Sequence, residues 1–334
     1  MKAGKFSIMK LFGILLLFLF IIILLLNFIP NKGNKECSLD NEYLTEELVF
    51  HSGYEAGSVG TPSNAHEKIT GIDNSFTDHN DWQKSFSDHP LFGNFRIWYE
   101  EGDASKRYAK IIDDPTSQEN KVLHFWLDEP HINYDVIKKK GRIQAAIVNN
   151  RNLRSFYIKQ RLFMPDDFEQ LKSYPKKINW LTIQEFWNDA TGKEFPFRVT
   201  LNMRKTTSEK GDLYFGTHAQ IKEKGKWVNI WASINEEYEV PIGEWITIET
   251  YLVEGNENEG RFVFEVTDSL GDKETIFDIT GYTHHPDDPC PDGFNRFNPI
   301  KLYTSDDLID YMTEENKILQ MYWDDFEIWA NKRP

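Results

Sequence analysis

Hydrogen-bonding and titratable side chains recur at every second position along four segments of this sequence. The segments are Gly141–Asn150, Trp180–Asn188, Phe197–Arg204 and Leu213–Ile221. Strand side chains alternate between two faces, so each segment should have one apolar face and one that contacts water. The second faces carry Arg142, Gln144, Trp180, Thr182, Gln184, Phe186, Asn188, Arg198, Thr200, Asn202, Arg204, Tyr214, His218 and Gln220. Cations, amides and aromatic rings on one sheet suit the binding of an anionic sugar chain.

Such a face could carry out β-elimination on a uronate. The reaction needs a group that neutralises the C5 carboxylate, a base for the C5 proton and an acid for the departing O4. The candidates for the neutralising group are Gln184, Asn202, and Arg142 or Arg198. The candidates for base and acid are His218 and either Tyr214 or Tyr303. The reaction requires no cofactor, and loss of water in place of a sugar would make the protein a dehydratase.

Further residues are expected to bind substrate without transferring protons. They are Arg142, Gln144, Asn202, Lys301, Trp180 and Phe186, the last two as rings that stack on sugars. Each also has an ordinary structural interpretation. Polar side chains are expected on the solvated face of any sandwich, and His218 could be a hydrogen-bonded structural histidine. Tyr303 could be a packed strand tyrosine, and the two rings could cover core.

The elements that must position these residues are short strands. About a dozen candidates are separated by Gly, Asn, Asp and Pro, while only Asp166–Tyr174 and Ser305–Glu315 favour short helices. No repeat of fixed period is present, which argues against propellers and solenoids. The pattern predicts an all-β fold: a single β-jelly-roll sandwich of two antiparallel sheets, covering residues 49–331.

The N-terminal region predicts export. Lysines precede an unbroken apolar run, Leu11–Leu26, and no small-residue cleavage site follows it. We expect residues 1–30 to be an uncleaved signal-anchor, or alternatively a cleaved signal peptide, and residues 31–48 to be a linker. The domain would then face the periplasm or exterior, held at the membrane or secreted. Cys37 and Cys290 could form a disulfide or remain free thiols.

Composition limits the partners. The net charge of −15 argues against nucleic acid, and against a polyanion held by overall charge alone. An anionic glycan could still bind to a locally basic cleft. Aromatic residues make up 14% of the chain, which is enough for a large core and excludes a disordered protein.

Several short motifs resemble one family of carbohydrate-active proteins. Phe50–Glu55 and Tyr322–Trp329 are similar to the opening and closing strands of concanavalin-like jelly rolls. Gly141–Gln144, Thr182–Trp187 and Gly243–Glu249 resemble strands of the jelly-roll polysaccharide lyases of the alginate-, glucuronan- and heparin-lyase type. The resemblance covers most of residues 50–330 and implies a lyase acting on an acidic polysaccharide.

Two positions depart from that family. Phe186 stands where alginate lyases of this type have a catalytic-site histidine, and Asn298–Ser305 matches their Lys- and Tyr-bearing strand only loosely. The resemblance also implies a structural Ca²⁺ near Asp325, since carboxylates favour that ion. The His284–Asp288 segment is better explained as a solvated turn than as a metal loop. A retaining glycosidase is disfavoured, because no paired-carboxylate strand exists and Glu185 falls on the core-facing side of the pattern.

The sequence therefore predicts an exported carbon–oxygen lyase that acts on a uronate-containing, possibly sulfated, polysaccharide or oligosaccharide. The alternative is a non-catalytic glycan-binding module on the same fold, which the phenylalanine at position 186 would suit. A scaffold protein of the cell envelope is a third interpretation.

Overall fold

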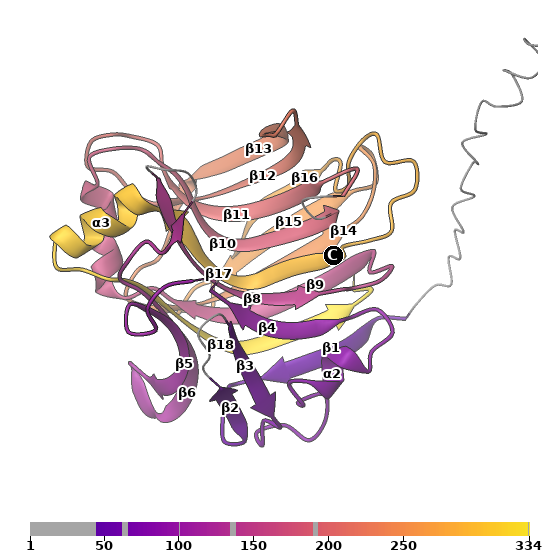
Figure 1. Cartoon of the computed structure of the whole chain (residues 1–334), viewed down its shortest axis with the longest axis horizontal. Helices are drawn as coiled ribbons and strands as arrows, with labels where there is room; N and C mark the ends of the chain where they lie inside the picture. Colours follow the sequence, from indigo (N-terminus) through magenta and orange to yellow (C-terminus); the bar gives the residue numbers. More distant parts are fainter. Residues whose placement is uncertain (1–44, 62–65, 100, 134–137, 190–192, 333) are drawn as a thin grey trace, which may run out of the picture. The chain divides into compact units, whose positions relative to one another are not determined.

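Two large antiparallel sheets form the domain, as the sequence predicts. The computed structural model describes residues 45–61, 66–99, 101–133, 138–189, 193–332 and 334 (Figure 1). The first sheet has the strand order β16 (Lys273–Thr280), β15 (Arg261–Thr267), β14 (Trp245–Val253), β9 (Ser155–Phe163), β18 (Leu319–Ala330), β6 (Ser117–Leu127), β5 (Arg107–Asp114), with β1 (Glu47–Ser52) paired to β18. We call it the back sheet.

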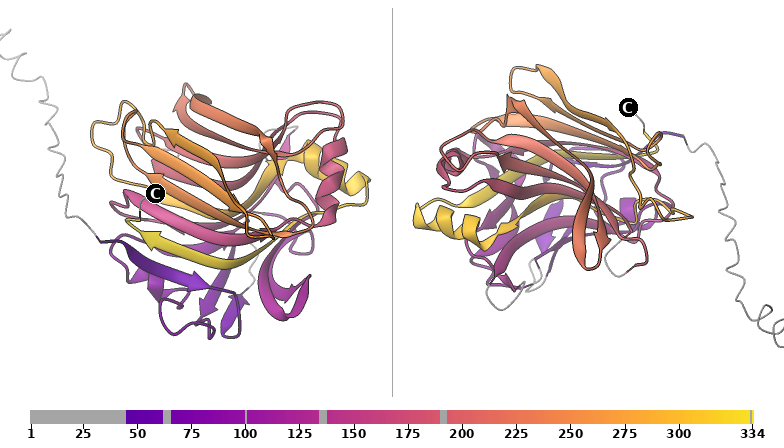
Figure 2. Two further views of the ribbon diagram at one scale, coloured as in Figure 1. Left: turned by 180° about the vertical axis from the view of Figure 1, so that it is seen from behind. Right: turned by 90° about the horizontal axis from the view of Figure 1, so that it is seen from above.

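The second sheet, here the front sheet, lies over the first (Figure 2). Its order is β13 (Lys226–Glu239), β12 (Tyr214–Glu223), β11 (Phe197–Lys205), β10 (Ile178–Asp189), β17 (Arg296–Ser305), β8 (Lys139–Val148), β4 (Asn94–Trp98), β3 (His66–Gly71), β2 (Ser58–Thr61), with β7 (Ile132–Asn133) paired to β8. Both end strands of the described domain, β1 and β18, pair with each other in the back sheet.

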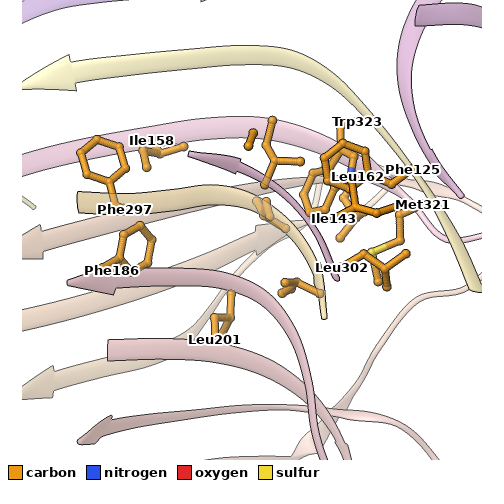
Figure 3. Close-up of a cluster of buried hydrophobic side chains, with 14 of the residues drawn as sticks. Phe125, Ile143, Ile158, Leu162, Phe186, Leu201, Phe297, Leu302, Met321 and Trp323 are labelled. Carbon is orange, nitrogen blue, oxygen red and sulfur yellow. The ribbon is translucent and has the colours of Figure 1, made fainter. Parts of the chain in front are cut away.

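Side chains from both sheets meet in one hydrophobic core (Figure 3). Phe156 of β9 stacks on Phe297 of β17 with ring centroids 4.8 Å apart, and Phe186 of β10 lies 5.3 Å from Phe156. Such aromatic pairs bury large areas and fix the two sheets face to face. The outer face of the front sheet is therefore the one left for polar side chains.

A β-bulge in β10 changes which residues reach that outer face. Thr182 pairs with Asn202, but Gln184 pairs with Leu201, so Ile183 is an extra residue. One extra residue moves every later side chain to the opposite face. The prediction that Gln184 and Phe186 face outward is therefore wrong. Both point into the core, and Glu185, expected to face the core, points outward.

The predicted helices are present. Asp166–Ser173 forms a 3₁₀ helix, η1, and Asp306–Glu314 forms the α-helix α3, with Ser305 at its N-cap position. A short helix, α2 (Lys84–Ser87), was not predicted. Asp306 and Asp307 in the first turn of α3 suit the positive end of the helix dipole.

Three predictions fall on the N-terminal residues 1–44, which lie outside the described residues. They are the signal-anchor, most of the linker, and the pairing of Cys37 with Cys290. Among the residues that the structure describes, no helix is both long and apolar enough to cross a membrane.

Candidate active site

A cleft of about 780 Å³ crosses the outer face of the front sheet. Its walls come from β10, β11, β12, β13 and β17, together with the Lys138–Lys140 segment and the start of α3. The residues that line it are Lys138, Lys139, Lys140, Asn179, Trp180, Thr182, Arg198, Thr200, Asn202, Arg204, His218, Gln220, Trp227, Asn229, Tyr303, Ser305, Asp306 and Asp307. Five of these are lysine or arginine and two are aspartate, so the cleft is basic although the chain is acidic.

Tyr303 is the cleft residue with the most cations around it. Strand register sets it between Thr182 of β10 and Arg142 of β8. Its ring centroid lies 4.8 Å from the Lys301 Nζ, 5.4 Å from the Arg142 guanidinium carbon and 5.5 Å from the Lys140 Nζ. The Trp180 ring packs against it at 4.8 Å. Cations at this range are attracted to the face of the ring, so these contacts hold Tyr303 in place on the cleft wall.

His218 belongs to a hydrogen-bonded chain on the same face. Thr182 Oγ1 donates to Asn202 Oδ1 (2.8 Å), and Asn202 Nδ2 donates to Thr200 Oγ1 (2.9 Å). Thr200 Oγ1 lies 2.8 Å from His218 Nε2 and can donate its proton there. Burial, with Arg198 and Arg204 nearby, lowers the pKa of His218 to about 4. At neutral pH the imidazole of His218 is therefore uncharged, and its Nε2 atom is already hydrogen-bonded to Thr200.

Glu185 forms a buried ion-pair cluster in the floor of the site. Its carboxylate accepts from Lys301 Nζ, from Arg198 Nη1 (2.9 Å) and from Asn298 Nδ2 (3.2 Å). Burial alone would raise its pKa, but Lys301 and Arg198 hold that pKa well below the usual range of a carboxyl. Burial lowers the pKa of Lys301, and the charge of Glu185 opposes that shift.

Arg198 is held by several contacts at once. Besides Glu185, its Nε and Nη2 donate to Gln220 Oε1 at 3.0 and 2.8 Å. Its guanidinium carbon lies 4.1 Å from the centroid of the Trp227 ring. The side chain is thus fixed in place and already uses donors on all three of its nitrogens.

The structure brings most of the predicted residues together. His218, Tyr303, Arg198, Asn202 and Trp180 line the cleft. Arg142, Gln144 and Lys301 lie on the same face. Gln144 of β8 pairs with Lys301 of β17 and Arg142 pairs with Tyr303, although Gln144 and Lys301 are fully buried. Tyr214 shares the His218 face of β12 but lies outside the cleft lining.

The two residues displaced by the bulge have structural contacts instead. Gln184 Oε1 accepts from Thr250 Oγ1 of the back sheet at 2.8 Å, across the core. Phe186 is fully buried and packs beside Phe297 (Figure 3). Neither side chain can reach a sugar in the cleft.

The predicted calcium ligand lies on β18, away from the cleft. Asp325 is 3.7 Å from Arg161, and its neighbour Asp324 already accepts from Asn120 (2.9 Å) and from the Asp325 backbone N–H (2.8 Å). Across the described ranges, no group of three or more His, Cys, Asp or Glu side chains is placed to hold a metal ion. The calcium site stays a prediction.

Sequence reasoning missed Glu185, Trp227 and the Lys138–Lys140 segment. A signal existed for Glu185, because a carboxylate assigned to a core-facing position has no partner there and burying it is costly. That conflict indicates a bulge before it. The Lys138–Lys140 segment lies at the start of β8. The sequence does not specify which strands neighbour β8, so it could not show that these lysines reach the cleft.

No family model matches this chain, and no curated protein is similar to it in sequence. Solved structures are similar in fold. The endo-β-1,4-glucuronan lyase of the fungus Trichoderma reesei is 10% identical, with a TM-score of 0.43 over 70% of this chain and 90% of the enzyme. The alginate lyase Aly36B is 11% identical (TM-score 0.44; 69% and 85% covered), and the alginate lyase of Aplysia kurodai is 11% identical (0.39; 70% and 89%). Polysaccharide lyases, the type that the sequence motifs resemble, are thus among its structural neighbours.

Proposed function

We propose that the protein is a carbon–oxygen lyase that cleaves a uronate-containing glycan by β-elimination. The observation that carries this proposal is the position of Tyr303, a phenol within 5.5 Å of three cations in a basic cleft. A base that works beside a bound carboxylate needs such compensation, and the cleft supplies it without a charged histidine.

Each residue is assigned a role from its charge and from the contacts that it already makes. Arg142 neutralises the C5 carboxylate, because its guanidinium carbon lies 5.4 Å from the centroid of the Tyr303 ring. Tyr303, as the phenolate, accepts the C5 proton, the C4–C5 double bond forms, and the C4–O4 bond breaks. Tyr303 then returns the proton to O4. His218 cannot be that acid, because an imidazole with a pKa near 4 is not protonated at neutral pH.

The test is the ultraviolet absorbance of newly formed unsaturated uronate, measured with a panel of uronate polysaccharides and oligosaccharides. Tyr303→Phe should lower the rate by about 10²-fold or more and leave binding intact. Tyr108→Phe is the matched control, since Tyr108 stacks on Trp126 in the back sheet. Full activity of Tyr303→Phe would refute the assignment, and product mass separates chain cleavage from loss of water.

One observation favours a second candidate, a non-catalytic glycan-binding module. The low basicity of His218 leaves Tyr303 as the single well-placed proton carrier among the described cleft residues. Retention of an acidic glycan with no absorbance change in the wild-type protein would establish this alternative.

A further inference from the structure

A second cationic cluster lies on the front sheet beside the cleft. It comprises Arg96 and Trp98 of β4, Gln144 of β8 and Arg296 of β17, and we call it the arginine platform. Trp98 pairs with Gln144, and Gln144 pairs with Lys301, so the platform continues the cleft face across β8. Arg96 and Arg296 share one indole: their guanidinium carbons lie 4.5 and 5.3 Å from the centroid of the Trp98 ring.

The two arginines of the platform lack ion-pair partners within the described protein. Neither Arg96 nor Arg296 forms an ion pair with a described carboxylate, and the Nε atom of each is buried without a hydrogen-bond partner. Burial lowers the pKa of Arg296, and repulsion by Arg142 and Arg96 lowers it further, although Glu185 opposes the shift. These arginines therefore destabilise one another.

The amide beside them is equally unsatisfied. Gln144 is 0% exposed, and both its Oε1 and its Nε2 lack a partner among the described residues. Asn298 Oδ1, on the neighbouring strand, is buried and unpartnered as well. Buried polar atoms are nearly always paired in folded proteins, and several orphans in one place need a specific reason.

A ligand anion supplies that reason. Guanidinium groups bind carboxylates and sulfates through paired hydrogen bonds, and an indole offers a flat face to a sugar ring. We propose that the arginine platform is a second anion subsite, which takes the carboxylate or sulfate of an acidic sugar next to the one held at Tyr303. The anion subsite stands on its own observations, and only its connection to a continuing sugar chain rests on the proposed function.

The first experiment uses inorganic sulfate and no sugar. Thermal unfolding of the protein is followed with sodium sulfate and with sodium chloride at equal ionic strength. Sulfate should raise the Tm of the wild type by more than it raises that of Arg96→Gln or Arg296→Gln, because the exclusion of sulfate from protein surfaces stabilises all three to a similar extent. Both variants should match or exceed the wild-type Tm in chloride, because each removes a repelled charge. Arg261→Gln is the control, since Arg261 pairs with Asp278 at 2.9 and 2.8 Å in the back sheet.

Two outcomes would overturn the proposal. One is a sulfate shift that is as large in both variants as in the wild type, which would show that the platform binds no sulfate. The other is a loss of stability in both variants in chloride, together with no sulfate shift in the wild type. The arginines would then be structural.

The second experiment identifies the source of the anion. Di- and tetrasaccharides of uronate, sulfated and unsulfated, are titrated into Tyr303→Phe and into Tyr303→Phe/Arg296→Gln. We expect a loss of about tenfold in affinity for the tetrasaccharide and little change for the disaccharide. Equal losses at both lengths would refute a separate subsite. A sulfate effect without any oligosaccharide binding would retain the anion subsite and reject the proposed function.

Discussion

The buried pair of Glu185 and Lys301 makes a quantitative prediction about stability. Both side chains are almost completely buried, at 4% and 0% exposure, and their charged ends are in contact. The perturbation is a double-mutant cycle of Glu185→Gln, Lys301→Met and the two together. The cycle measures how far the effects depart from additivity, which isolates the coupling between the two side chains.

The expected magnitude follows from what each single change leaves behind. Removing one partner of a buried ion pair costs about 3–5 kcal/mol of the free energy of unfolding, because the other charge remains in a dry site. Lys301→Met should fall near the lower end, since Arg198 still pairs with Glu185 at 2.9 Å. The double variant leaves Arg198 but no buried lysine or carboxylate, so it should cost clearly less than the sum of the singles. We expect a coupling of about 2–3 kcal/mol.

The assay is urea unfolding at pH 7. The slope of the unfolding free energy against urea concentration is compared among the variants, and only variants that unfold in two states enter the cycle. The control pair is Glu254→Gln and Arg154→Gln. Glu254 is as buried as Glu185, at 2% side-chain exposure, but Arg154 is 41% exposed and is solvated when alone. The double-mutant cycle of Glu254 and Arg154 should give a coupling of about 1 kcal/mol or less. Additive effects at Glu185 and Lys301 would refute the reasoning, because they would mean that solvent reaches the pair.

Two further predictions concern residues outside the cleft. Burial lowers the pKa of His124 to about 4, so between pH 6.5 and 4 the unfolded chain binds more protons than the folded one. The free energy of unfolding therefore decreases as the pH is lowered through this range. By urea unfolding, His124→Gln should reduce the wild-type loss between pH 7 and 4.5 by about 2 kcal/mol, and an unchanged loss would contradict the buried neutral imidazole. Gln184→Met should retain the proposed lyase activity but lose about 1–3 kcal/mol of the free energy of unfolding, because Thr250 loses its acceptor, and Gln184→Met/Thr250→Val should recover most of this loss. If the Gln184→Met variant stays folded but loses activity, Gln184 takes part in the site after all.

Strand alternation predicted the faces of three of the four polar segments. In β11 and β12, Arg198, Asn202 and His218 reach the cleft, while Val199 and Phe215 are buried. No bulge interrupts the pairing between these two strands, so the period of two holds along their whole length. The fold class followed from the same pattern, because repeated two-sided strands without helices pack as sandwiches.

The fourth segment failed for a physical reason. Its pairing shifts by one residue at Ile183, and β17 shifts as well between Phe297 and Ile300. A bulge arises from how neighbouring strands fit, and an isoleucine carries no local mark of it. The cost of burying Glu185 without a partner was the one clue in the sequence. Cation positions across β8 and β4 depend on sheet order, which local patterns do not specify.

The charge of the whole chain and the charge of this face have opposite signs, and distance decides which one a ligand feels. At physiological ionic strength the Debye length is about 8 Å, so most of the net −15 is screened from a glycan on the front sheet. The cations that line the cleft and the two unpaired arginines of the platform lie within contact range and are partly desolvated, so they are screened much less. Holding them there costs stability, because Arg96 and Arg296 gain no ion pair with any carboxylate that the structure describes. Cations retained at such a cost on one sheet face are explained by an anion that binds them, and an acidic sugar chain supplies one at each successive residue.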